Sequence, residues 1–372
     1  MTNAQMPEPS VITVRPAAAA DNDALNSLVR RCPMRADISL IVERDPDFFA
    51  LSRARGRTST FLAEVDGAVV GCISAWRHSA WLDGSPSEIC YIGDLRIAPD
   101  QRRRGIATQL VSKLDKFLDT LPQVPFLLAT GAGNSAVERL TSGFGTSGEP
   151  LARITSWQLF PVVPLKISAG LDIGAAEPRD EDGLVSFLDD FHRRRHCSPV
   201  FGGGGLGELL ARCPGAKLSD YLLARHRGRI VAALALWDAS AVRRTRVVGM
   251  PLWLRSVCAA ARAVSHITAL PPFPQVGTLL CFRYIRHAAF ADGHEDSLNS
   301  LVRRAVNEAR ARHEHFVLYT CADDDPLCSG VSGLPRLSFR YNVSAADSTT
   351  NLALRDANFS KPTWFFEDAA LA

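Results

Sequence analysis

The sequence contains an internal repeat. Residues 62–70 and 223–231 align without a gap at a constant offset of 161. At the same offset, Trp76 aligns with Trp237. Each segment reads as two apolar strands around a turn that contains glycine, the pattern of a β-hairpin. At 372 residues the chain is also longer than a typical single domain. The repeat therefore predicts a duplicated domain of about 160 to 200 residues.

Two further registers link the halves, and both lie at larger offsets. At offsets of 188 and 190 they pair Ile97 with Ile285, Gly105 with Gly293, and Phe126 with Phe316. Loop insertions would increase the offset between segments in this way. We predict two domains, residues 1–162 and 163–372, joined by a linker marked by Pro161 and Pro164.

Hydrophobic periodicity gives the order of elements in each half. For the first half it predicts a strand at 11–15, a helix at 21–31, a helical region at 38–53, a hairpin at 60–76, a strand at 89–97, a helix at 105–118, a strand at 125–130, a short helix at 135–140 and a strand at 154–160. The second half repeats this order, with helices at 180–192 and 295–311 and a strand at 315–320. We predict an α/β (α+β) fold in which each domain has a mixed, mostly antiparallel sheet flanked by helices.

One junction in the first half is suited to a phosphate group. After the strand that ends near Ile97, the chain reads Arg102-Arg103-Arg104-Gly105-Ile106-Ala107 and enters an amphipathic helix. Such a junction places free backbone N–H groups, the positive end of a helix dipole and three arginines together. We predict that it binds a pyrophosphate.

The junction resembles motif A of the GCN5-related N-acetyltransferase (GNAT) superfamily, Gln/Arg-x-x-Gly-x-Gly/Ala. The order of elements also resembles the fold of that family, in both halves. The resemblance implies that the chain uses acyl-coenzyme A, expected to be acetyl-CoA, without a metal. It implies a cofactor site made of Leu95, Arg96, Ile97, Arg102, Arg103, Arg104, Gly105, Ile106, Ala107, Thr108 and Asn134. Asn134 is equally suited to a helix N-cap.

N-acyl transfer requires a base that accepts a proton from the attacking amine. We expect Asp94 first, because it lies on the cofactor strand, with Tyr91, Glu88 and Glu43 as alternatives. The family often has a tyrosine four residues before a Gly-Phe pair, where this sequence has Arg139. The proton donor to the leaving thiolate is therefore unassigned. Cys90 could carry an acyl group, but buried packing is the favoured interpretation.

The second half departs from the phosphate-binding pattern. At the offset of 188, the three arginines correspond to Phe290, Ala291 and Asp292, and the helix begins near Glu295. An acidic helix start repels phosphate. We therefore predict one coenzyme A site per chain, in the first half. The second half would support the fold or recognise substrate.

Composition limits the class of protein. A net charge of +3 argues against binding nucleic acid through bulk charge. The nine cysteines form no CxxC pair, which favours free thiols in a reducing compartment and no metal. No signal peptide is evident, and the apolar stretch 251–270 is interrupted by arginines, so we expect a cytoplasmic protein that does not bind a membrane.

We therefore predict an N-acyltransferase, and by resemblance an N-acetyltransferase, acting on a small-molecule or peptide amine, as a monomer or homodimer. Two alternatives stay open: a non-catalytic acyl-CoA-binding sensor or scaffold, which the missing tyrosine favours, and a transferase for longer acyl chains.

Overall fold

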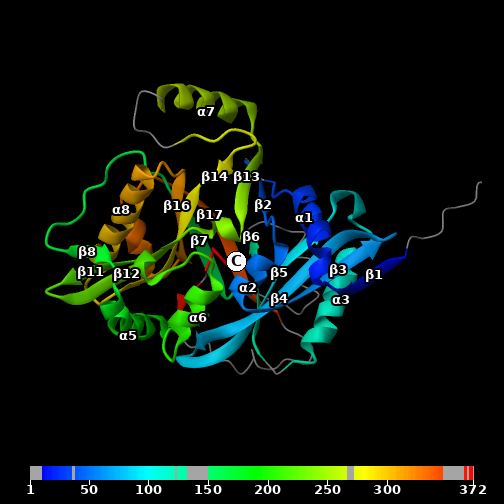
Figure 1. The fold of residues 1–372 in the computed structure, drawn as a ribbon, viewed down its shortest axis with the longest axis horizontal. Helices are drawn as coiled ribbons and strands as arrows, with labels where there is room; N and C mark the ends of the chain where they lie inside the picture. The colour runs from blue at the N-terminus through cyan, green and yellow to red at the C-terminus, as the bar shows by residue number, and fades with distance from the viewer. Residues whose placement is uncertain are drawn as a thin grey trace, which may run out of the picture.

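The computed structural model describes residues 11–35, 38–121, 124–131, 150–265, 272–346, 364–366 and 368–371. A single large sheet runs through both halves and is flanked by helices (Figure 1). Most neighbouring strands are antiparallel, with parallel pairs only at β5–β6 and β15–β16 within this sheet. The predicted fold class is confirmed.

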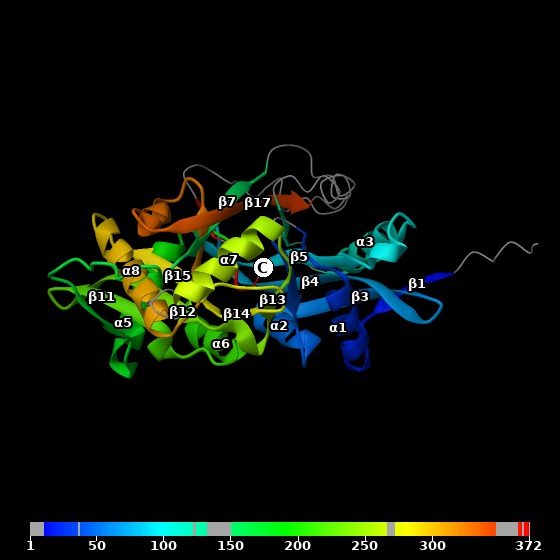
Figure 2. The same cartoon turned by 90° about the horizontal axis from the view of Figure 1, so that it is seen from above.

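In the first half, the strands are β1 (Ile12–Pro16), β2 (Ser39–Glu43), β3 (Arg57–Val65), β4 (Ala68–Leu82), β5 (Ser85–Ile97), β6 (Phe126–Gly131) and β7 (Ala152–Leu159). The helices are α1 (Asn22–Arg31), α2 (Phe48–Arg55) and α3 (Ile106–Leu118). Figure 2 shows α1 and α2 on one face of the strands and α3 on the other. The predicted helix at 135–140 lies outside the described residues.

In the second half, the strands are β8 (Asp172–Ala175), β9 (Arg195–His196), β10 (Ser198–Pro199), β11 (Tyr221–His226), β12 (Arg229–Trp237), β13 (Arg244–Gly249), β14 (Leu279–Leu280), β15 (Phe282–Phe290), β16 (Phe316–Ala322), β17 (Arg336–Ala346) and β18 (Trp364–Phe365). The helices are α5 (Glu181–His192), α6 (Gly205–Arg212), α7 (Leu252–Ser265) and α8 (Glu295–Ala311).

The hairpin repeat is present in the structure with the same register in both copies. Leu62 pairs with Cys72 and Leu223 with Ala233, and each hairpin then shifts register by one residue at the same place, after Ala63 and after Ala224. The offset of 161 therefore describes equivalent positions in three dimensions.

The order of strands in the large sheet is symmetric about its centre. It runs β1-β3-β4-β5-β6-β17 and then β7-β16-β15-β12-β11-β8. Strand β17, from the second half, pairs with β6 of the first half. Strand β7, from the first half, pairs with β16 of the second. The two halves have thus exchanged their last strands, and β17 and β7 pair with each other at the centre.

Two sequence predictions need correction. Residues 38–53 are not one helical region, because β2 occupies 39–43 and only α2 is helical. β2 pairs with β13 of the second half, a long-range contact that local periodicity does not reveal. The pairing of Ile97 with Ile285 is also wrong: Ile97 lies opposite Gly71, and the residue in that position of the second half is Phe290.

Candidate functional site

Strands β5 and β6 separate after a short parallel ladder. The ladder joins residues 90–92 of β5 to residues 126–128 of β6. Beyond it, β6 continues to pair with β17, and β5 continues to pair with β4 through Ile97. The sheet therefore opens between β5 and β6 at residues 93–97. The predicted cofactor residues Leu95, Arg96 and Ile97 lie on the β5 side of this opening.

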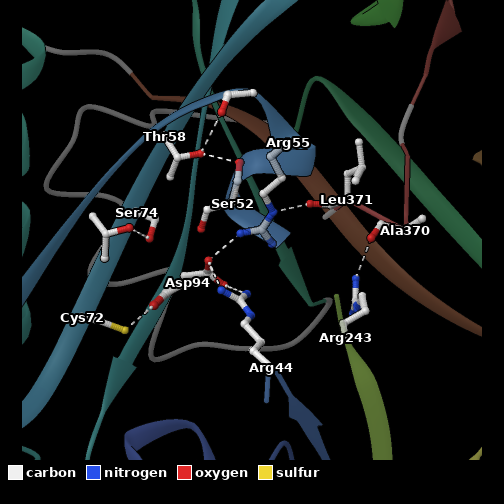
Figure 3. A network of polar contacts seen from close by, with 12 residues as sticks. Arg44, Ser52, Arg55, Thr58, Cys72, Ser74, Asp94, Arg243, Ala370 and Leu371 are labelled. Atoms are coloured by element: carbon white, nitrogen blue, oxygen red, sulfur yellow. Dashed lines mark hydrogen bonds and ion pairs between the residues drawn. The ribbon is translucent and has the colours of Figure 1, made fainter. Parts of the chain in front are cut away.

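A β-bulge lies at the start of the opening. Cys72 pairs with Arg96 and Ser74 with Gly93, so β5 has one more residue than β4 between these pairs. Asp94 in this bulge has a φ of 56°, in the left-handed region. A bulge redirects side chains and frees backbone groups from the ladder. Here it points the side chain of Asp94 toward α2 (Figure 3).

The glycine junction follows β5 directly. Gly105 has a φ of 76° and is the N-cap of α3. That backbone conformation favours glycine. The first N–H groups of α3, on residues that include Ala107 and Thr108, have no partner within the helix by geometry. They lie beside a positive dipole end, an arrangement suited to an anion.

The three arginines of the junction are exposed. Arg102 donates from Nε to the carbonyl of Ile97 at 3.3 Å, and Arg104 donates to the side chain of Gln101. Arg103, with a φ of 65°, is available for an external anion. The residues present therefore fit the diphosphate of a coenzyme A. The structure brings together all the predicted cofactor residues except Asn134, which lies outside the described residues.

Asp94 is held by two buried arginines (Figure 3). Its carboxylate accepts from Nη1 of Arg44 at 2.9 Å and also from Nη1 of Arg55, and the Asp94 side chain is 5% exposed. Arg55 donates from Nε to the carbonyl of Leu371 and stacks 4.1 Å from the ring centroid of Trp76. Arg44 and Arg55 were not among the sequence candidates.

The charges of Arg44 and Arg55 set the pKa of Asp94. Burial by itself would raise the pKa of the carboxyl, but Arg44 and Arg55 hold that pKa well below its usual range. Burial in turn lowers the pKa of Arg55 to about 10, against the opposing effect of Asp94. A carboxylate in this setting is a weak proton acceptor, so the geometry favours a positioning role for Asp94.

Tyr91 lies in an aromatic stack on the same sheet face as α2. Its ring centroid is 5.6 Å from that of Trp76 and 6.3 Å from that of His78, with near-parallel planes. All three side chains line a cavity of about 50 Å³ between the two halves of the molecule. Of the three predicted catalytic residues, Tyr91 borders this cavity and Asp94 and Glu43 do not.

Glu43 belongs to the contact between the halves. It is the last residue of β2, it is buried, and Nε of Arg246 on β13 donates to its carboxylate at 2.5 Å. Glu88, the other alternative, contacts Arg57 and Arg77 at the surface end of β5. Both carboxylates thus have arginine partners in the structure.

The second half repeats the bulge and the opening but not the junction. β15 and β16 pair only over 282–284 and 316–318, and His287, with a φ of 52°, lies in a bulge of β15. Gly293 follows Phe290 after three positions, whereas Gly105 follows Ile97 after eight. The arginine loop is therefore missing here, rather than replaced by Phe290, Ala291 and Asp292 as the sequence alignment suggested. The first turn of α8 is acidic, with Glu295 and Asp296.

Comparison with known proteins agrees with this geometry. Residues 23–145 match the acetyltransferase (GNAT) family. The match covers this one domain, about a third of the chain. It supports an acyl-CoA N-acyltransferase in general terms. A search of curated proteins gives no match to the sequence.

Solved structures with the same fold extend over nearly the whole chain. A GCN5-related N-acetyltransferase from Sphaerobacter thermophilus has a TM-score of 0.54 at 13% identity, covering 90% of this chain and 95% of that one. Saccharomyces cerevisiae N-myristoyltransferase with bound myristoyl-CoA has a TM-score of 0.61 at 9% identity, covering 93% and 85%. At these identities the likeness concerns the fold alone, and it extends over both halves of the chain.

The described residues also bear on a metal site, a reactive thiol and a membrane-spanning helix. Over the described ranges, no group of three or more His, Cys, Asp or Glu side chains could hold a metal ion. Burial raises the pKa of the Cys90 thiol to about 12, against the charge of Arg77. No helix in the described part of the chain is long and apolar enough to cross a membrane.

Proposed function

We propose that this protein is an acyl-CoA-dependent N-acyltransferase, with acetyl-CoA as the donor and the active site in the first half. The observation that carries the proposal is the alignment of three features along β5: the opening toward β6, the bulge at Asp94 and the glycine junction at Gly105. In this proposal, the three features lead from the anion site at the start of α3 to the cavity beside Tyr91.

In this proposal the diphosphate of the donor binds at the start of α3, and the acyl arm lies in the opening beside Leu95 and Ile97. The acceptor amine approaches from the other face of the sheet, where α2 lies (Figure 2). Arg55, at the end of α2, also lines the cavity. Because the opening separates the strands, a donor on one face and an acceptor on the other can meet there.

The chemistry is direct transfer. The amine nitrogen forms a C–N bond to the thioester carbon, and the C–S bond breaks as the thiolate leaves. The negative charge on the carbonyl oxygen is stabilised by a backbone N–H freed at the bulge. The amine proton passes to a base and the thiolate takes up a proton, so the overall charge balances.

The identity of the base stays a proposal. Tyr91 is placed at the cavity and is the favoured candidate of the three. We propose that Asp94 instead fixes Arg55 and Arg44, and that Glu43 anchors β2 to the second half through Arg246. We further propose that residues 1–162 and 163–372 are two acetyltransferase-type units, supported by the symmetric order of strands.

The test is a thiol-release assay with acetyl-CoA and a panel of amines. We expect free coenzyme A to appear at a rate that depends on the amine. Binding of acetyl-CoA by calorimetry without release for any amine would favour a non-catalytic binder. A parallel series with acetyl-, hexanoyl- and myristoyl-CoA measures the preferred chain length, and a preference for the longest chain would overturn the acetyl assignment.

A further inference from the structure

The cavity beside Tyr91 is built by both halves of the molecule. Its volume is about 50 Å³. The first half contributes the face of β4 and β5 and the end of α2. The second half contributes α6 and β15, and Phe366, Asp368 and Leu371 also line the cavity. The side chains that matter for its charge are Arg55, Arg212, Arg286, Asp368, His78 and His287.

Two of the three arginines in the cavity are neutralised. Arg55 pairs with Asp94. Arg286 pairs with Asp368, with Nη2 to Oδ2 at 2.6 Å and Nε to the same oxygen at 2.8 Å. Asp368 is therefore already occupied by a cation and does not balance a second one.

Arg212 is the remaining cation. It ends α6, it is half-buried, and among the described contacts its guanidinium has no ion pair. Its Nε is buried without a hydrogen-bond partner in the part of the chain that the structure describes. A cation enclosed in this way is costly unless an anion accompanies it.

Two imidazole side chains that line the same cavity, His287 and His78, each have a ring nitrogen without a hydrogen-bond partner among the described residues. His287 is 3% exposed, and its Nε2 has no hydrogen-bond partner among the described residues, although Oδ2 of Asp368 lies 4.0 Å from it. Nδ1 of His287 lies 2.6 Å from the Tyr221 hydroxyl. With that hydroxyl assigned as the donor, the ring proton is on Nε2 and is available to a ligand.

His78 is the second imidazole. Its Nδ1 is buried and also has no partner in the described ranges. Burial, followed by the charge of Arg212, lowers the pKa of His78 to about 4, so this ring is neutral near pH 7. Burial and the charge of Arg286 likewise hold the pKa of His287 well below its usual range. Among the described residues that line the cavity, Arg212 is therefore the cation without a carboxylate partner.

We propose that this cavity binds a carboxylate group of the acceptor, with Arg212 and Nε2 of His287 as its donors, so that the acceptor is an amino acid or another amine that carries a carboxylate. The inference rests on the proposed N-acyltransferase function and gives it a substrate class. A guanidinium fork matches a planar carboxylate. A volume of 50 Å³ corresponds to about two waters at roughly 30 Å³ each, which is room for a carboxylate group.

The proposal also gives the second half a function. Both proposed donors, Arg212 on α6 and His287 on β15, come from that half, whereas Tyr91 and the glycine junction come from the first. The half without an arginine junction would thus select the acceptor for the half that binds coenzyme A.

The experiment compares matched acceptors with the full-length protein. The amines are the twenty amino acids, their carboxamides and the corresponding decarboxylated amines, assayed with acetyl-CoA by thiol release at a pH where each amine is partly unprotonated. We expect at least one acid to exceed its amide and its decarboxylated form by tenfold or more in kcat/KM. Arg212→Gln should remove this difference mainly by raising KM, and Arg212→Lys should restore part of it.

Arg179→Gln provides the matched control, because Arg179 is exposed, pairs with Glu177 and does not line the cavity. It should leave the preference unchanged. Equal rates for acid and amide in the wild-type protein, or a preference that survives Arg212→Gln, would overturn the proposal.

A second measurement separates this inference from the transferase function. N-acetylated amino acids and their amides are added to the protein and thermal unfolding is followed. If no amine is acylated, the proposed function fails, but stabilisation by the acids alone, lost in Arg212→Gln, would still support the carboxylate site. Absence of stabilisation together with absence of acid preference refutes the site itself.

Discussion

Asp94 and His287 occupy the same position in the two halves of the molecule. Each lies in a bulge on the strand next to the repeated hairpin, and each has a positive φ, 56° and 52°. The backbone feature has been kept in both copies while the side chain differs. In the first half the carboxylate is closed off by two arginines, whereas in the second half the imidazole lines the cavity.

Asp94→Asn should destabilise the fold. The change leaves Arg44 and Arg55 buried without their anion, a loss of about 3–5 kcal/mol in the free energy of unfolding. Urea unfolding at pH 7 measures it. The exposed pair Asp100–Arg31 provides the control, and Asp100→Asn should leave the urea midpoint unchanged.

The ion pairs of Asp94 with Arg44 and Arg55 predict a pH dependence of stability. Because the folded pKa of Asp94 lies well below 3.8, its ionised form stabilises the native state above about pH 4, and this contribution is lost as the pH falls toward the folded pKa. The stability gap between wild type and Asp94→Asn should therefore narrow below pH 4. A gap that stays constant down to pH 3 would show that Asp94 is not the titrating group.

Arg103→Glu with Arg104→Glu should abolish coenzyme A binding. The wild-type chain is expected to bind one coenzyme A, and reversing two charges at the start of α3 removes charge-assisted contacts worth about 1–3 kcal/mol each. Calorimetric titration measures both stoichiometry and affinity. Arg179→Glu, far from the junction, should bind as wild type does. A stoichiometry of two would contradict the assignment of one site per chain.

Neither half should fold properly by itself. Without residues 163–372, β6 loses its partner β17, and without residues 1–162, β16 loses its partner β7. Exposed apolar strand edges promote aggregation. We expect each half to be insoluble when expressed separately and a soluble complex when the two are co-expressed, as measured by gel filtration. A soluble, cooperatively unfolding 1–162 fragment would argue against dependence on the exchanged strand.

Cys90 should not carry an acyl group. With a pKa of about 12 it is almost entirely a thiol near neutrality, and it is fully buried. Cys90→Ala should retain transferase activity, and iodoacetamide at pH 7.5 should modify the exposed Cys281 before Cys90, as mapped by mass spectrometry. An acetylated Cys90 peptide recovered after incubation with acetyl-CoA would contradict this.

The sequence by itself determined most of the local elements, including the strand, loop and helix around Gly105. The hairpin at offset 161 was readable because alternating apolar residues and a turn glycine fix a hairpin without distant contacts. The junction at Gly105 was readable for the same reason, since strand, basic loop and helix are consecutive. The loss of the arginines in the second half was also visible, although the alignment attributed it to substitution where the structure shows a shorter loop.

Tertiary structure alone decided the rest. The exchange of β7 and β17 and the pairing of β2 with β13 depend on hydrogen bonds between segments far apart in the chain. The ion pairs of Asp94 with Arg44 and Arg55 likewise join distant segments. Periodicity reports which face of a strand is buried but not which strand lies beside it. For that reason the sequence suggested Asp94 as a base, whereas the structure shows it as an ion-paired residue. Arg212 and His287 were not sequence candidates, and both line the cavity between the halves.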